Sequence, residues 1–144
     1  MIYNIRNATL TDALSLNVLS KNEMGYDCSV EQTEENLKQT LSKDYECVFV
    51  AESEGKIVGY LHGCDYCLLF SKKMVNLLGL AVDSNYTRMG IGSELIKTFE
   101  EWAIKRNAKG IRLVSGEKRK EAHKFYEKCG FESTKNQKNF KKMF

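Results

Sequence analysis

One stretch of this chain decides its fold, and it reads Val82-Asp83-Ser84-Asn85-Tyr86-Thr87-Arg88-Met89-Gly90-Ile91-Gly92-Ser93. The apolar run that leads into it, residues 74–82, is typical of a buried β-strand. After Gly90 the apolar residues recur every three or four positions up to residue 103, which is the spacing of an amphipathic helix. A strand, a short loop and two glycines at the start of a helix therefore predict a backbone site for an anion.

The two glycines indicate what kind of group could bind there. The first amides of a helix have no acceptor within the helix and lie at the positive end of its dipole. Glycine has no Cβ, so a phosphate can approach these amides closely, and Arg88 adds a full positive charge. A P-loop is excluded because Ser93-Glu94 stand in place of Lys-Ser/Thr, and a dinucleotide fingerprint is excluded because Leu95 replaces its third glycine. Taken alone, the glycine pair fits an ordinary tight turn equally well.

A second pattern lies in residues 118–131, where a predicted helix is closed by glycine. Taken with the glycine loop, it resembles the GNAT superfamily of acetyl-CoA-dependent N-acetyltransferases. The cofactor motif of that family is Gln/Arg-x-x-Gly-x-Gly/Ala after a strand ending in Leu-x-Val, and its next motif is Ala-x-x-(Phe)-Tyr-x-x-x-Gly-Phe. The matching residues are Leu80, Ala81, Val82, Thr87, Arg88, Met89, Gly90, Ile91 and Gly92, followed by Ala122, Phe125, Tyr126, Gly130 and Phe131.

The periodicity along the chain predicts a mixture of strands and helices. We expect strands at residues 2–6, 47–51, 57–61, 74–82 and 111–114, helices from residue 11, between 30 and 41, from 90 to 103 and at 118–128, and a final strand or hairpin from residue 131 onward. This order indicates an α/β fold with a largely antiparallel front half. The resemblance implies a GNAT-like mixed, mainly antiparallel central sheet flanked by about four helices. With 144 residues, we expect a single domain over 1–144.

The resemblance also implies roles for the residues of the two motifs. It places the cofactor-binding residues at Leu80, Ala81, Val82, Thr87, Arg88, Met89, Gly90, Ile91, Gly92 and Ser93. A backbone N–H near Val82 would stabilise charge on the thioester oxygen, and Tyr126 would protonate the departing thiolate. Two positions depart from the family pattern: Thr87 stands where Gln or Arg is usual, and Leu78 stands where the family often carries a catalytic Glu.

The absence of that Glu leaves the general base open. The candidates on the central strands are His62, Asp65 and a water held by Asn76, and a weakly basic amine could also lose its proton to solvent. His123 is disfavoured because helical geometry places it on a face adjacent to that of Tyr126.

Charge is distributed unevenly along the chain. Residues 105–144 carry 13 Lys and Arg against 4 Asp and Glu, a balance of +9, whereas residues 21–54 carry 3 against 9, a balance of −6. Because the resemblance places residues 21–54 over the acceptor site, we expect a cationic acceptor, either a small molecule or a peptide amine. The basic end, including Arg119, Lys120 and Lys124, would assist the phosphates of acetyl-CoA.

The predicted function is transfer of an acetyl group from acetyl-CoA to a primary amine, by direct attack in a ternary complex. The alternative is a non-catalytic acyl-CoA-binding module of the same fold, which the missing Glu favours. Nucleic-acid binding by the basic end is disfavoured, because Phe125 and Tyr126 lie on a core or cofactor face rather than among the lysines.

Composition bears on localisation and on metal binding. No apolar run reaches the ~18–20 residues of a membrane span, and the first residues lack the grading of a signal peptide. We therefore expect a cytoplasmic protein with reduced cysteines and no membrane partner. The cluster Cys64-Asp65-Tyr66-Cys67 near His62 lacks the second ligand pair of a structural zinc site, so we expect no metal. A homodimer is one assembly that the sequence leaves open.

Overall fold

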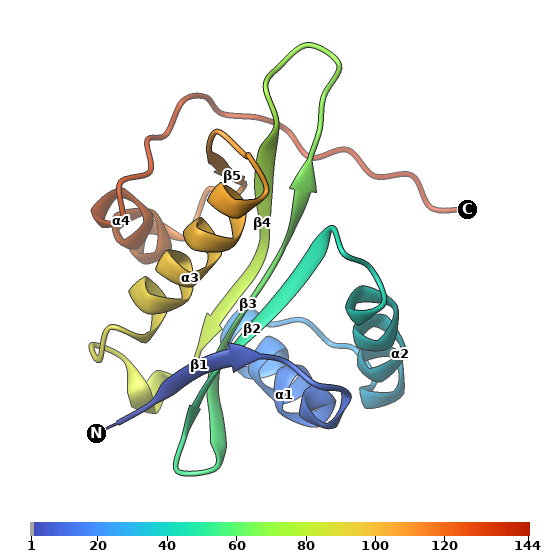
Figure 1. Cartoon of the computed structure of the whole chain (residues 1–144), viewed down its shortest axis with the longest axis vertical. Coiled ribbons are helices and arrows are strands. Elements are labelled where there is room, and N and C mark those ends of the chain that lie inside the picture. Colours follow the sequence, from blue (N-terminus) through green and yellow to red (C-terminus); the bar gives the residue numbers. More distant parts are fainter. Residues whose placement is uncertain (1) are drawn as a thin grey trace. The chain divides into compact units, whose positions relative to one another are not determined.

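The computed structural model describes residues 2–144, which form two compact units that divide between Val114 and Ser115. The first unit holds a five-stranded sheet in the order β1-β2-β3-β4-β5 (Figure 1). Its strands are β1 (Asn4–Asn7), β2 (Glu46–Ser53), β3 (Lys56–Tyr66), β4 (Met74–Val82) and β5 (Ile111–Leu113), and its α-helices are α1 (Ala13–Met24), α2 (Val30–Leu41) and α3 (Ile91–Lys105). Short 3-10 turns lie at η1 (Leu10–Asp12) and η2 (Ser84–Tyr86), and the second unit contains α4 (Lys120–Lys128).

The sheet is antiparallel except at one edge. The pairs β1–β2, β2–β3 and β3–β4 are antiparallel, and β4–β5 is parallel. The chain turns tightly from β2 to β3 at Glu54 and Gly55, which both have positive φ. It passes from β4 to β5 through α3, because a parallel neighbour requires a crossover. The predicted mixed, mainly antiparallel sheet with four helices is confirmed.

Helices cover both faces of the sheet in the first unit (Figure 1). On one face, side chains of the central strands pack with α1 and α2 in a core that includes Leu16, Leu19, Leu37, Val48, Val50, Tyr60 and Ala81. On the other face lies α3, whose inward side chains Ile91, Leu95, Ile96 and Phe99 are at most 2% exposed. Their spacing is that of a single helix face. The predicted amphipathic helix therefore buries its apolar stripe against the sheet.

Two glycines of β3 allow α3 to lie close to the sheet. A Cβ on Gly59 would lie 3.1 Å from Cγ2 of Ile91, and a Cβ on Gly63 would overlap the ring of Phe99. Any larger residue at either position would push the helix outward. The short separation between β3 and α3 thus depends on the absence of a side chain at Gly59 and at Gly63.

The predicted strand or hairpin from residue 131 onward is wrong. Residues 131–144 form neither helix nor strand in the structure. A strand needs a partner for its backbone and an apolar face to bury. Between Phe131 and Phe140 the residues are polar, and Phe140, Met143 and Phe144 are largely exposed. This stretch therefore has no apolar face of the kind that would fix it in a sheet.

Among residues 2–144, no helix combines the length and the apolar character needed to cross a membrane.

Replacing Gly63 with alanine tests the close approach of α3. The added methyl group would overlap the Phe99 ring, so the free energy of unfolding should fall by ~1–3 kcal/mol, as overpacking typically costs. Urea denaturation followed by the fluorescence of Trp102 measures this, because Trp102 is the only tryptophan and stacks on Phe99 at 5.7 Å. Combined with Phe99→Leu, the loss should be smaller than the sum of the single losses. A Gly63→Ala protein as stable as the wild type would contradict the packing described.

Candidate active site

The parallel pairing between β4 and β5 ends partway along β4. The paired residues are Val75 with Ile111, Asn76 with Arg112 and Leu77 with Leu113. β4 continues to Val82 and remains paired with β3 on its other side, and Figure 1 shows β4 extending well past the short β5. Within residues 2–144, one edge of β4 therefore has no neighbouring strand from Leu78 onward.

A β-bulge at Leu78 decides which backbone groups face this open edge. Gly63 pairs with Leu77 and His62 pairs with Gly79, so Leu78 is an extra residue in β4. Before the bulge, the N–H of Val75 points toward the β5 side, where it donates to the Gly110 carbonyl at 3.0 Å. After the bulge, the N–H of Asp83 points the other way and donates to the Val58 carbonyl at 2.8 Å. The extra residue has reversed the direction of the odd-numbered amides.

The reversed direction places two amides at the open edge. Backbone groups along a strand alternate between its two sides. Because Asp83 bonds to β3, Ala81 also faces β3, and the N–H groups of Leu80 and Val82 face the open edge. The side chain of Ala81 is 4% exposed and belongs to the core. Of the three predicted residues on this strand, Leu80 and Val82 can therefore offer backbone donors to a ligand.

The loop that follows β4 leads directly into α3. Asp83 accepts a hydrogen bond from the N–H of Asn85 at 2.9 Å, and the Thr87 hydroxyl donates to the Ser84 carbonyl at 3.3 Å. Arg88 and Gly90 both have positive φ, at 65° and 79°. These bonds and the two left-handed residues bend the chain sharply before the helix begins.

The first turn of α3 presents the predicted anion site. Gly90 is the N-cap, and the first helical hydrogen bond runs from the N–H of Glu94 to the Gly90 carbonyl at 3.0 Å. The amides of Ile91 and Gly92 come before that bond, so the helix itself does not use them. The Ile91 side chain is 2% exposed and packs toward β3. Only its backbone could contact a ligand, and the side chains of Arg88 and Met89 are exposed.

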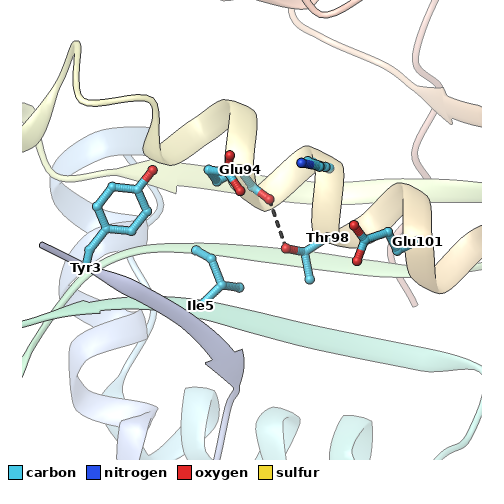
Figure 2. A pocket seen from close by; sticks show the side chains of 6 residues that line it. Tyr3, Ile5, Glu94, Thr98 and Glu101 are labelled. Atoms are coloured by element: carbon cyan, nitrogen blue, oxygen red, sulfur yellow. Dashed lines mark hydrogen bonds between the residues drawn. The ribbon is translucent and has the colours of Figure 1, made fainter.

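Tyr3, which the sequence analysis did not single out, lies directly before β1 and contacts this loop. The Tyr3 hydroxyl donates to the Met89 carbonyl at 3.4 Å, and partial burial, with the nearby Glu94 carboxylate, raises the pKa of Tyr3. Tyr3 also lines a pocket of about 440 Å³ with Ile5, Glu94, Lys97, Thr98 and Glu101 (Figure 2). This pocket contains none of the predicted site residues. Nothing in the local sequence around Tyr3 signals the contact, because it depends on tertiary packing.

The candidate bases differ in how they are held. Asp65 accepts two hydrogen bonds from Arg106, at 2.8 and 2.6 Å, and lies 3.3 Å from the Lys73 ammonium. The Arg106 guanidinium holds the pKa of Asp65 below its usual value, which makes this carboxylate a poor proton acceptor. The Asn76 side-chain oxygen accepts from Arg112 at 3.0 Å. His62 instead lies 2.9 Å from a carboxylate oxygen of Glu46.

In the second unit, Tyr126 lies on α4 among aromatic rings. Its ring meets Phe125 and Phe131 edge-on, with centroids 5.5 and 5.8 Å apart. Burial raises the pKa of Tyr126, although Arg119 acts in the opposite direction. The helix ends as predicted, because Gly130 has φ 96° and the N–H of Phe131 donates to the Tyr126 carbonyl at 3.0 Å. Because its pKa is raised, the Tyr126 hydroxyl stays protonated at neutral pH.

The described residues offer no evident metal centre. Among residues 2–144, no group of three or more His, Cys, Asp or Glu side chains is placed to hold a metal ion. The cysteines at 28, 47, 64 and 67 are free thiols. Burial raises the pKa of Cys47 to about 12, so this thiol stays neutral and packs as an apolar group.

Comparison with known proteins identifies the family. The model of the Acetyltransferase (GNAT) family matches residues 10–131, and the chain belongs to this family. An uncharacterized N-acetyltransferase of Methanocaldococcus jannaschii is 30% identical over 148 residues, covering 98% of this chain and 66% of that protein. N-acetyltransferase 8 of Homo sapiens is 33% identical over 99 residues, covering 67% of this chain and 43% of that protein. The chain thus spans about two thirds or less of the length of these relatives.

Solved structures confirm the fold. The aminoglycoside N-acetyltransferase AAC(6')-Iy in complex with CoA has a TM-score of 0.88 to this chain at 18% identity, covering 98% of this chain and 95% of that chain. At this identity the likeness concerns the fold. The resemblance that the two sequence motifs indicated is confirmed.

Replacing Gly90 with alanine tests the glycine loop. A non-glycine residue in the left-handed region costs ~1–2 kcal/mol, and we expect the loop to shift and the dissociation constant for coenzyme A to rise about fivefold or more. Isothermal titration calorimetry measures this. Gly55→Ala is the matched control, because Gly55 has φ 77° with no neighbour near its missing Cβ. It should lower stability and leave coenzyme A binding unchanged. Equal affinities of all three proteins would show that the loop does not hold the diphosphate.

Proposed function

We propose that this chain transfers an acetyl group from acetyl-CoA to the primary amine of a cationic small molecule or peptide, by direct attack within a ternary complex. The observation that carries this proposal is the open edge of β4, which runs through Leu80 and Val82 into the glycine loop. Acetyl-CoA has the matching parts in the same order: a thioester, an extended arm with two amides, and a diphosphate. An extended amide chain can bond to a strand edge as another strand would, and a diphosphate suits a helix N-terminus.

The residues present therefore fit acetyl-CoA, which when bound would supply an activated acetyl thioester. The N–H of Val82, held in the sheet, would stabilise negative charge developing on the thioester oxygen. Tyr126 would donate a proton to the sulfur as the carbon–sulfur bond breaks. Its raised pKa supports this role, because a donor must be protonated at working pH. The family match crosses the boundary between the two units, which supports one functional domain over 1–144.

The acidic segment supports a cationic acceptor. Asp27, Glu31, Glu34 and Glu35 are exposed on the link between α1 and α2 and on α2 itself. Glu23, near the end of α1, accepts a hydrogen bond from the N–H of Ser84 at 3.2 Å. This bond places one carboxylate of the acidic segment, that of Glu23, next to the loop that follows β4. A positive amine would be attracted to such a surface as it approaches the thioester.

One observation favours the alternative of a non-catalytic acyl-CoA-binding module. Leu78, at the position where the resemblance leads one to expect a Glu, is half exposed at the bulge and supplies no proton acceptor. A protein of this kind would bind acetyl-CoA and leave it intact in the presence of any amine. Turnover therefore separates the two proposals, whereas binding alone does not.

A thiol-release assay over a panel of amines tests the proposed reaction. The panel should contain polyamines, aminoglycosides, amino acids and lysine-bearing peptides, each with acetyl-CoA and with the acetylated product identified by mass spectrometry. We expect the highest kcat/KM with acceptors that carry more than one positive charge. Tight binding of acetyl-CoA without release across the whole panel would instead establish the binding module. A preference for anionic amines would contradict the role given to the acidic segment.

Tyr126→Phe tests the proton donor. The variant keeps the ring and its aromatic contacts and removes only the hydroxyl, so kcat should fall about 100-fold, as loss of a general acid typically costs. The KM for acetyl-CoA should stay close to the wild-type value. Tyr45→Phe is the matched control, since Tyr45 is 46% exposed directly before β2, and it should behave as the wild type. Unchanged turnover of the Tyr126 variant would remove this residue from the mechanism.

A further inference from the structure

A histidine and a glutamate meet on the face of the sheet that α1 and α2 cover. His62 pairs with Val48 across β2 and β3, and Val48 belongs to the core under these helices. Nε2 of His62 lies 2.9 Å from Oε1 of Glu46, and the side chains are 30% and 12% exposed. The pair is thus largely enclosed while the imidazole keeps some access to solvent.

The glutamate fixes the orientation of the imidazole. Both of its oxygens are anchored, because the Thr40 hydroxyl donates to Oε1 at 3.4 Å and the Lys43 ammonium lies 3.3 Å from Oε2. Burial tends to raise the pKa of Glu46, but the bonds from His62 and Lys43 outweigh it and hold that pKa below its usual value. The ionised carboxylate can only accept, so Nε2 of His62 must carry the proton. Nδ1 is then the basic nitrogen, and within residues 2–144 it has no hydrogen-bond partner.

The imidazole lies on the β3 side of β4, level with the start of its unpaired part. His62 pairs with Gly79, the residue directly after the bulge, and the next residue is Leu80, whose N–H faces the opposite, open edge. Gly79 has no side chain, and a Cβ there would lie 3.7 Å from the Tyr60 hydroxyl and 3.9 Å from the Met24 methyl group. A methyl group at Gly79 would thus be in ordinary van der Waals contact, and Gly79 lies one strand spacing from His62, or about 5 Å. An amine that reached Gly79 on this face would therefore come within about one strand spacing of the imidazole.

The other basic candidates are poorly placed for this role. Asp65 pairs with Val75 and bonds to Arg106 directly after α3, so it lies on the opposite face of the sheet. Asn76 is held by Arg112. We propose that His62 is the base that removes the proton from the acceptor amine and that Glu46 is its positioning residue, an inference that rests on the acetyl transfer proposed above.

The step balances as follows. An ammonium acceptor gives one proton to Nδ1 of His62, and the neutral nitrogen attacks the thioester carbon. The carbon–nitrogen bond forms and the carbon–sulfur bond breaks, with the electron pair leaving on sulfur. After the attack the nitrogen loses its second proton to solvent, and Tyr126 gives its proton to the thiolate. Solvent then returns a proton to Tyr126 and removes the proton from His62. The products are an N-acetyl amine, free coenzyme A and one released proton.

The test compares His62→Gln with Glu46→Gln and with the control His123→Gln. Glutamine at position 62 can still donate to Glu46 but supplies no base, so kcat with acceptors that are protonated at pH 7 should fall about 100-fold. The KM for acetyl-CoA should remain within about twofold, since a base acts after binding. With an aromatic amine, which is already neutral at pH 7, the loss should be about threefold or less, and added imidazole should restore part of the activity. A merely structural role would lower the rates of both kinds of acceptor equally.

A measurement without turnover checks the same geometry. The chain has only two histidines, so 15N spectra of His62→Gln assign the imidazole signals of His62 in the wild type. The neutral ring should carry its proton on Nε2, and Glu46→Gln should shift it toward a mixture of the two tautomers and lower kcat about tenfold. If His62→Gln does not fold, the control His123→Gln assigns the signals instead, and the Glu46 variant and the spectra carry the test. A proton on Nδ1, or equal loss with both kinds of amine, overturns the inference. A wild-type protein inactive with every amine overturns the proposed function and this inference with it.

Discussion

The site depends on a single constraint: β4 extends beyond its neighbour β5, so part of one edge of β4 is unpaired. A strand edge without a partner leaves backbone donors and acceptors that something else must satisfy, and in a sheet this is a template for further pairing. β5 pairs with β4 only up to Leu77, and the bulge at Leu78 then turns the amides of Leu80 and Val82 toward the vacated side. Without the extra residue, Gly79 and Ala81 would face that side instead.

The same bulge determines where the two substrates of the proposed reaction, the thioester carrier and the amine, would meet β4. Side chains that follow it alternate between the face of α3 and the face of α1 and α2. Val82 pairs with Gly59, against which Ile91 of α3 packs, whereas Gly79 and Ala81 face the core under α1. The thioester carrier would thus lie along the edge while the amine arrives from the face where His62 and Gly79 stand. Both approaches would then be positioned by residues of the sheet.

The sequence predicts the parts of the site that are local and misses the parts that depend on register. The apolar run before Val82 and the helical spacing after Gly90 indicate the strand, loop and helix that the structure contains. The bulge leaves no such signal, because no periodicity marks Leu78 as an extra residue. His62 and Glu46 are 16 residues apart, and their contact follows only from the pairing of β2 with β3. The expected strand or hairpin from Phe131 onward was wrong because the residues between Phe131 and Phe140 are polar and offer no apolar face for a sheet to bury.

Amide hydrogen exchange of β4, followed by NMR with and without coenzyme A, tests the central claim most directly. The account predicts that the amides of Leu80 and Val82 exchange quickly in the free protein and become protected when coenzyme A binds, while the amide of Ala81 is protected in both states. Slow exchange of Leu80 and Val82 in the free protein, or no change on binding, would contradict it.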